Sequence, residues 1–285
     1  MNSLQELFNT IAQHDINIAQ QVIAILQSRN DQFHYNLFHD VADVRLMLAK
    51  LNNLTEQRFS LATNYPLAVE SNDHHFPWGT KNDNTRCPRF VKASESLFPG
   101  KRLSYLDMGC SGGGLVFDFL VAGHDAFGLE GSDFSMKTQR AEWRIIPNAL
   151  KTADITKSFE ITKCETKSQA QFDVITMWEV LEHIPELSLP SLLSNIRRHL
   201  ANDGVFVGSV ALQDDIVNGV SYHPTVKPKN WWHEKFREHD FEVFEYELLS
   251  AADHCRGTGN GPLDPNFQQN PEKGFHITLK HRKHN

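Results

Sequence analysis

The chain has 285 residues, 40% hydrophobic and 22% charged, which is enough for one large globular domain and a smaller appendage. Its formal net charge is −7 and it has no run of five Lys or Arg residues, which argues against an extended surface for nucleic acid. The 4 cysteines are scattered without a C-x-x-C pair, no apolar run approaches the ~20 residues of a membrane span, and the N-terminus lacks a signal-peptide pattern. We therefore expect a cytoplasmic protein.

Residues 1–60 are predicted to form two amphipathic helices, broken near residues 28–31. Apolar residues recur there at alternating spacings of four and three. The seam positions are Leu4, Phe8, Ile11, Asp15, Ile18, Val22 and Ile25, then Leu37, Val41, Val44, Leu48, Leu51, Thr55 and Arg58. A period of 3.5 fits both a packed hairpin and a coiled-coil arm that joins two copies of the chain. We place residues 1–62 in a helical extension, with homodimerisation through residues 1–60 left open.

Residues 63–98 are predicted to be a polar lid or linker. The stretch 62–92 is rich in Asn, Asp, His and Pro and carries Phe76 and Trp78. Loops of this length are uncommon in compact domains unless they are functional or disordered. Residues 89–98 then indicate a short helix. We expect this segment to cover a ligand bound by the residues that follow.

The pattern of residues 103–133 predicts a strand, a glycine-rich turn, a helix and a second strand that ends in an acidic residue. This order is half of a nucleotide-binding βαβ unit. An apolar run ends at Met108, and a glycine-rich turn follows. Glycines let the backbone approach a ligand with no Cβ in the way. Glu130 closes the second apolar run, where a carboxylate can accept both hydroxyls of a ribose.

The turn has the frame Asp107-x-Gly109-x-Ser111-x-Gly113, which differs from the G-x-G-x-x-G of dinucleotide sites. An acid two residues before the first glycine disfavours a pyrophosphate and suits a cationic ligand. The frame resembles motif I of the class I S-adenosylmethionine (SAM)-dependent methyltransferases, usually D/E-x-G-x-G-x-G. Ser111 stands in place of the middle glycine.

A second signature is the stretch 172–185, FDVITMWEVLEHIP, which predicts a buried parallel strand and the turn at its carboxyl end. It resembles motif IV of the methyltransferase branch that includes ubiquinone-biosynthesis O-methyltransferases. The resemblance is good over residues 100–210 and holds only in outline over 211–285. It implies an α/β, Rossmann-like domain over residues 99–285, with a mostly parallel seven-stranded sheet whose last strand is antiparallel.

The resemblance also implies SAM as cofactor and a set of residues that bind it. Glu130 takes the ribose, Asp154 accepts from the adenine amino group, and the amide beside it meets the ring. The full set is Asp107, Gly109, Cys110, Ser111, Gly113, Glu130, Gly131, Asp154, Ile155, Trp178 and Glu179. Outside that context, Asp154 would be an ordinary turn residue.

The remaining elements alternate between helices and strands. Helices are expected within 132–148, 189–200 and 230–236, and strands at 205–210, 241–249 and 274–280. The loops 62–92, 211–230 and 251–272 carry aromatic and polar residues and are expected to form the acceptor pocket. The acidic balance favours a small molecule or a glycan as the acceptor, methylated on a hydroxyl.

His183 is the candidate general base for a hydroxyl acceptor, because it lies at a strand's carboxyl end and titrates near neutrality. The alternative is that Glu182 and His183 only hold the next helix in place. His223 and His254, in the two later loops, are weaker candidates for the base.

The motif Glu179-x-x-Glu182-His183 also resembles the metal-binding E-x-x-E-H of small-RNA 2′-O-methyltransferases. Those enzymes need a further downstream histidine, for which His239 is the candidate. A divalent metal is not favoured, because the same motif occurs in enzymes of this branch without one. An RNA or protein methyltransferase, metal-assisted or not, and a non-catalytic SAM-binding partner subunit are the alternative functions.

Overall fold

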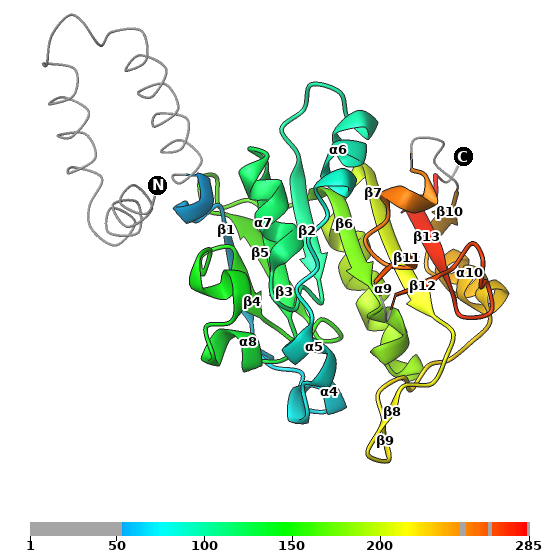
Figure 1. Cartoon of the computed structure of the whole chain (residues 1–285). Coiled ribbons are helices and arrows are strands. Elements are labelled where there is room, and N and C mark those ends of the chain that lie inside the picture. Colours follow the sequence, from blue (N-terminus) through cyan, green and yellow to red (C-terminus); the bar gives the residue numbers. More distant parts are fainter. Residues whose placement is uncertain (1–52, 245–248, 262–263, 284–285) are drawn as a thin grey trace, which may run out of the picture. The chain divides into compact units, whose positions relative to one another are not determined.

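The computed structural model describes residues 53–244, 249–261 and 264–283 (Figure 1). Its central sheet has the strand order β10-β13-β7-β6-β2-β3-β4. The seven strands are β2 (Ser104–Met108), β3 (Asp125–Glu130), β4 (Leu150–Thr152), β6 (Phe172–Trp178), β7 (Leu200–Ala211), β10 (Phe241–Val243) and β13 (Gly274–His281). All neighbours pair in parallel except β13, which is antiparallel to both β7 and β10. The predicted Rossmann-like fold is confirmed, including its antiparallel last strand.

The strands are apolar on both faces, so both faces of the sheet must be covered. In β2, Leu106 and Met108 belong to one large cluster of buried residues. Tyr105 points to the other face and stacks on Phe119 of α7 (Gly114–Val121), with ring centroids 3.8 Å apart. Alternation along a strand therefore assigns each side chain to one of two packed layers.

Further helices complete these layers: α6 (Pro88–Leu97), α9 (Leu189–His199) and α10 (Lys229–Glu238). Helix α6 packs on α7, and its Phe90 is fully buried. Helix α9 begins with a Pro in its first turn and ends in three basic residues, which suits the negative end of the helix dipole. The short helix at 89–98, the helix at 189–200 and the one after residue 229 are each close to their predicted positions.

A two-stranded ribbon, β1 (Phe59–Thr63) with β5 (Phe159–Lys163), was not foreseen. The sequence pattern places residues 59–62 in the helical extension, but Phe59 instead packs against Phe127 and Phe172 of the main sheet. Burial of this aromatic side chain favours a strand there. Apart from residues 53–62, the predicted helical extension and its dimerisation arm lie outside the described residues.

The single helix expected within 132–148 is wrong. The structure has only α8 (Phe134–Lys137) and a 3₁₀ turn over Ala141–Arg144. Gln139 and Ala141 take left-handed φ angles of 50° and 49°, which a continuous helix does not allow. The strand expected at 241–249 is shorter, with β10 ending at Val243 and residues 245–248 outside the described part.

The carboxyl ends of the parallel strands lie at the lower end of the sheet in Figure 1, together with several short elements. These include α4 (Asn72–His75), α5 (Trp78–Asn82) and the hairpin β8 (Ile216–Val217)–β9 (Val220–Ser221). A further pair, β11 (Thr258–Gly261) with β12 (Asp264–Asn266), belongs to the later glycine-rich loop. Among the described helices, none is both long and apolar enough to cross a membrane.

Candidate cofactor and acceptor site

The glycine turn between β2 and α7 adopts the conformation that its sequence predicts. Gly109 and Gly113 have φ angles of 88° and 84°, and a Cβ on either would collide with a neighbouring side chain. Ser111, in place of the middle glycine, also takes a left-handed φ of 47°. Such a φ is uncommon for a residue other than glycine, asparagine or aspartate. The backbone therefore follows the path of a three-glycine turn in spite of the substitution.

Two side chains that sequence reasoning missed hold Ser111 in this conformation. Trp143 donates its indole N–H to the Ser111 carbonyl at 2.7 Å. Arg140 donates to the Ser111 hydroxyl at 3.0 Å and to the backbone carbonyl of Asp83 at 2.6 Å. Inward placement of Arg140 and Trp143 explains why the predicted helix is broken there. No local pattern signals these roles, because both partners lie far away in sequence.

The acids around the turn are buried. Burial raises the pKa of Asp107 to about 7, and the charges of Asp83 and Glu130 add to the shift, although Thr176 donates to its carboxylate at 2.7 Å. Burial also raises the pKa of Glu130 and of Glu179. A cationic ligand would stabilise the ionised form of these groups, whereas a pyrophosphate would not. These buried carboxylates therefore suit SAM, which carries an ammonium and a sulfonium.

Glu130 links the second strand to the glycine turn. Its Oε2 accepts from the backbone N–H of Ser111 at 2.7 Å, and its Oε1 accepts from the N–H of Ser132 at 3.2 Å. The Thr80 hydroxyl of α5 donates to the same Oε1 at 3.4 Å. The predicted ribose acceptor is thus buried beneath the polar segment that precedes α6.

The residues predicted to hold the adenine lie beside the start of that polar segment. The Gly131 carbonyl accepts from the N–H of Ala68 at 3.0 Å, and Asp154 donates its N–H to the Tyr65 carbonyl at 2.9 Å. The Asp154 Oδ1 also accepts from both the N–H and the hydroxyl of Thr156, the geometry of a turn. Ile155 is buried. Asp154 thus makes the turn contacts that a lone Asp would make, and its predicted contact with adenine stays a prediction.

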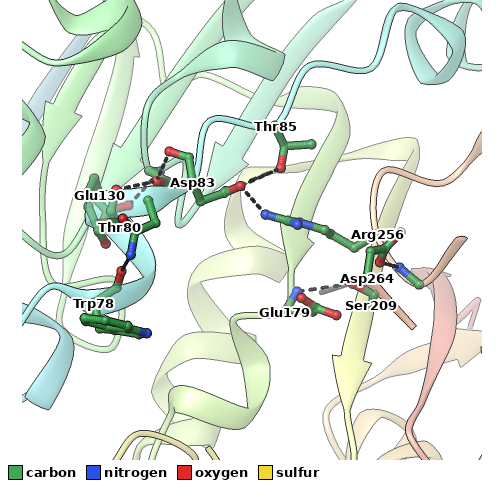
Figure 2. A network of polar contacts seen from close by, with 12 residues as sticks. Trp78, Thr80, Asp83, Thr85, Glu130, Glu179, Ser209, Arg256 and Asp264 are labelled. Carbon is green, nitrogen blue, oxygen red and sulfur yellow. Dashed lines mark hydrogen bonds and ion pairs between the residues drawn. The ribbon is translucent and has the colours of Figure 1, made fainter. Parts of the chain in front are cut away.

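Figure 2 shows a polar network that crosses from this region to the C-terminal loop. The Asp83 carboxylate forms an ion pair with Arg256 and accepts from the Thr85 hydroxyl at 3.1 Å. Glu179 has a left-handed φ of 54° and donates its N–H to Ser209 of β7. The charge of Arg256 favours the Glu179 carboxylate, against the larger effect of burial. The sequence did not single out Asp83 or Arg256.

Two other predicted cofactor residues serve as packing at the same edge. Trp178 meets Phe90 edge-on, with centroids 5.2 Å apart, and its buried indole N–H has no hydrogen-bond partner among the described residues. Cys110 is buried and donates its N–H to the Leu129 carbonyl at 3.0 Å. An indole N–H left without an acceptor is costly in a protein interior.

His183 lies in a 3₁₀ turn over Leu181–His183, directly after β6. Its Nδ1 is 2.9 Å from Oδ2 of Asp73 in α4, 110 residues away in sequence. Burial disfavours the charged imidazole, but the hydrogen bond and charge of Asp73 outweigh burial and raise the pKa of His183 to about 9. The expectation that His183 titrates near neutrality is therefore wrong, because its partner Asp73 lies far away in the sequence. The His223 ring lies 4.6 Å from the His183 ring, centroid to centroid.

The other candidate groups lie elsewhere. His254 stacks on His276 at 3.9 Å, and burial together with the charge of His276 lowers its pKa to about 4. His239 follows the end of α10. The group of possible metal ligands in the described part of the chain contains Glu182, His183 and His223, and neither Glu179 nor His239.

Comparison with known proteins agrees with this geometry. Residues 80–255 match the family model described as "Methyltransferase domain". A ubiquinone biosynthesis O-methyltransferase of Methylococcus capsulatus is 31% identical over 204 residues, which is 67% of this chain and 76% of the relative. The enzyme of the same name from Bordetella bronchiseptica is 29% identical over 106 residues, 34% of this chain, so the match spans only 38% of that relative's length.

Solved structures with a similar chain path include two methyltransferases. A TehB-like SAM-dependent methyltransferase from Corynebacterium glutamicum has a TM-score of 0.47 and 16% identity, covering 75% of this chain and 99% of its own. A 1,6-didemethyltoxoflavin-N1-methyltransferase from Burkholderia thailandensis has a TM-score of 0.48 and 16% identity, covering 74% of this chain and 84% of its own.

Proposed function

The chain belongs to the SAM-dependent methyltransferase family, and on that basis we propose that it transfers the methyl group of SAM to a hydroxyl of a small-molecule or glycan acceptor. Methyl transfer is an in-line displacement at a carbon that the sulfonium already makes electrophilic. The protein's main contribution is therefore to position the acceptor and to take up its proton.

The observation that carries the choice of a hydroxyl is the pair formed by His183 and Asp73 at the carboxyl end of β6. A neutral hydroxyl is a poor nucleophile and gains from a proton acceptor, whereas an amine that is already unprotonated needs none. Asp73 fixes the ring through Nδ1, at 2.9 Å, and directs Nε2 to the acceptor. Because the pKa of His183 is raised to about 9, only the neutral fraction of the ring can take up the acceptor's proton, and we expect turnover to rise with pH toward that value. The name of the Methylococcus relative, an O-methyltransferase, points the same way.

The residues that would hold SAM are those of the glycine turn, Glu130 and the Asp154 region. Left-handed turns at Gly109 and Gly113 present backbone without a side chain, and Glu130 supplies a fixed carboxylate. Buried acids around the turn favour the cationic groups of the cofactor. The predicted binding set remains a proposal that substitution can test.

Residues 63–98 act as a lid in this proposal. The segment contacts the adenine side through Ala68 and Gly131, the ribose acceptor through Thr80 and Glu130, and the acceptor side through Asp73 and His183. One polar segment therefore touches all three parts of the site. Opening of the segment would admit SAM, and closing would exclude water from the reaction.

The first test is thermal unfolding of the full chain with S-adenosylhomocysteine and, separately, with NADH. A ligand at 100 times its dissociation constant stabilises the folded state by about 2.7 kcal/mol, which shifts the melting temperature of a chain of this size by roughly 5 °C. We expect a shift with S-adenosylhomocysteine alone. Phenolic, sugar and amine acceptors are then compared by the rate of S-adenosylhomocysteine release. Turnover confined to amines would contradict the proposal, and retained SAM binding without turnover on any acceptor would favour a non-catalytic partner subunit.

A further inference from the structure

Two cysteines that the proposed reaction does not use lie together where helix α6 meets the C-terminal loop. Cys87 is the N-cap residue of α6, and Cys255 closely follows the 3₁₀ turn over Ala251–Asp253, which contacts that helix. Sγ of Cys87 lies 4.0 Å from the backbone carbonyl oxygens of Asp253 and His254, directly before Cys255. The Cys255 thiol donates a hydrogen bond to the Cys87 sulfur. Two sulfur atoms from distant parts of the chain are therefore in direct contact.

Two further contacts hold Cys87 in this position. Asp118 of α7 accepts from the backbone N–H of Cys87 at 2.7 Å, which ties the start of α6 to the layer over the sheet. Arg89, in the first turn of α6, forms an ion pair with Asp253 at 2.7 Å, which ties the same helix to the C-terminal loop. Both cysteines are partly exposed, which leaves them open to a small solute. The dithiol is therefore preformed at the junction of the two segments.

Cys87 is the more reactive of the two sulfur atoms. The hydrogen bond from the Cys255 thiol lowers the pKa of Cys87 to about 7, although burial and the charges of Asp118 and Asp253 oppose ionisation. At neutral pH about half of Cys87 is therefore thiolate, compared with a few per cent of an unperturbed thiol. Burial raises the pKa of Cys255, so this residue stays a thiol. A low-pKa cysteine beside a second thiol is the arrangement typical of reversible cysteine oxidation.

We propose that Cys87 and Cys255 are a modification site at which hydrogen peroxide forms a reversible disulfide, and that this bond holds the lid closed. The Cys87 sulfur first attacks one peroxide oxygen. The sulfur–oxygen bond forms, the oxygen–oxygen bond breaks, and the released hydroxide takes a proton from solvent. The Cys255 sulfur then attacks the Cys87 sulfur, so that the disulfide forms and the sulfur–oxygen bond breaks. The second hydroxide leaves with the Cys255 proton as water.

In this sequence the two thiols are oxidised and one hydrogen peroxide is reduced to two waters. A dithiol such as dithiothreitol reverses the change by thiol–disulfide exchange, through a mixed disulfide, and is itself oxidised to its cyclic disulfide. The modification is therefore a reversible state of the chain.

The consequence for the cofactor rests on the proposed function, in which residues 63–98 open to admit SAM. Cys87 belongs to that segment, and Cys255 directly precedes Arg256. The disulfide would lie close in sequence to the ion pair of Asp83 and Arg256, which joins the same two segments (Figure 2). A partly exposed ion pair opens easily, whereas a covalent bond does not. The oxidised chain should therefore bind and release the cofactor more slowly than the reduced chain.

The first part of the test maps the bond. Untagged full-length chain is treated with hydrogen peroxide, alkylated and digested, and its peptides are identified by mass spectrometry. We expect a peptide that links Cys87 to Cys255 and that dithiothreitol removes. In Cys255→Ser, Cys87 should instead stop at the sulfenic acid, which dimedone traps. Cys164→Ser, which changes a cysteine just after β5, should form the same link as the parent. A parent chain in which Cys87 oxidises without any link to Cys255 would overturn the modification site.

The second part measures the rates at which S-adenosylhomocysteine binds and dissociates, by stopped-flow tryptophan fluorescence. Both rates should fall several-fold in the oxidised parent and recover with dithiothreitol, whereas peroxide should leave the rates of Cys87→Ser unchanged. Circular dichroism checks that each variant folds, and the comparison of oxidised with reduced parent needs no variant. Equal rates in a parent sample that carries the mapped disulfide would overturn the effect on the lid. Failure of the reduced parent to bind S-adenosylhomocysteine would overturn the proposed function and leave the mapped disulfide standing.

Discussion

The backbone N–H of Ser111 lies 2.7 Å from Oε2 of Glu130. This bond joins the middle of the glycine turn to the acid at the end of the next strand, two features that the sequence presents separately. It requires the N–H of Ser111 to point at β3, which the left-handed φ of 47° achieves. The serine is therefore compatible with the turn because its surroundings hold it there.

Glu130→Ala should weaken S-adenosylhomocysteine binding by roughly 10–100-fold, because charge-assisted hydrogen bonds are worth about 1.5–3 kcal/mol. The lower affinity should have two causes. The variant lacks the predicted ribose contact, and its glycine turn is no longer hydrogen-bonded to the end of β3. Calorimetric titration measures it, and Glu160→Ala, on the exposed side of β5, serves as control. Equal affinity in the two variants would remove Glu130 from the cofactor site.

Gly113→Ala should be more destabilising than Gly123→Ala. Both glycines have left-handed φ angles, 84° and 93°, so both variants pay a backbone cost of about 1–2 kcal/mol. A Cβ on Gly113 would lie 2.5 Å from Cδ1 of Leu150, whereas one on Gly123 meets nothing within 4 Å. Overpacking adds about 1–3 kcal/mol at Gly113. Urea unfolding compares the two, and equal midpoints would contradict the close packing of turn against β4.

The free energy of unfolding should fall as the pH rises from about 4 to 7, with Asp107 contributing. Burial raises its pKa from 3.8 to about 7, so in this window the folded chain keeps a proton that the unfolded chain has released. The stability that Asp107 contributes is fully present below its pKa in the unfolded chain, 3.8, and is lost once the pH rises through its pKa in the folded chain, about 7.

Asp107→Asn removes that titration, so the parent chain should lose up to about 3 kcal/mol relative to the variant between pH 4.5 and 7.5. Denaturant unfolding at the two pH values measures the change. If the difference in unfolding free energy between parent and variant is the same at both pH values, Asp107 is ionised in the folded chain over the whole range.

Asp83 and Arg256 should act as a unit in closing the lid. Their ion pair joins the segment before α6 to the C-terminal loop, and only about a quarter to a third of each side chain is exposed. Asp83→Asn and Arg256→Met should each weaken S-adenosylhomocysteine binding by a few-fold, and the double variant should be little worse than either. The more exposed pair of Lys227 and Glu186 provides a control cycle. Fully additive effects would mean that the pair does not couple the two segments.

His183→Ala should lower kcat by about 100-fold or more, the range expected for a lost proton acceptor or acceptor-activating group. SAM affinity should change much less, because the hydrogen-bond partner of the His183 ring is Asp73 and not a predicted cofactor residue. Steady-state kinetics with a titration of S-adenosylhomocysteine separates the two effects, and His239→Ala is the control. A fully active His183→Ala would remove His183 from the reaction.

Local features of the chain were predictable. The glycine turn, the apolar strand before it and the acid after the next strand are properties of contiguous residues, and each was found where the pattern placed it. The buried strand at 172–178 follows equally from its own composition. The helix expected within 132–148 failed because Arg140 and Trp143 turn inward to hold Ser111, and such tertiary contacts override local propensity.

The sequence by itself therefore determined the sheet, the order of its motifs and the family, because these depend on short-range periodicity and on glycine and acid positions. Only the tertiary structure decided which distant residues meet at the carboxyl ends of the strands. Asp73 lies 110 residues from His183, and His223 rather than Glu179 completes the cluster with Glu182. These contacts arise where loops with no periodicity pack over a sheet edge, and nothing in the local sequence encodes that packing.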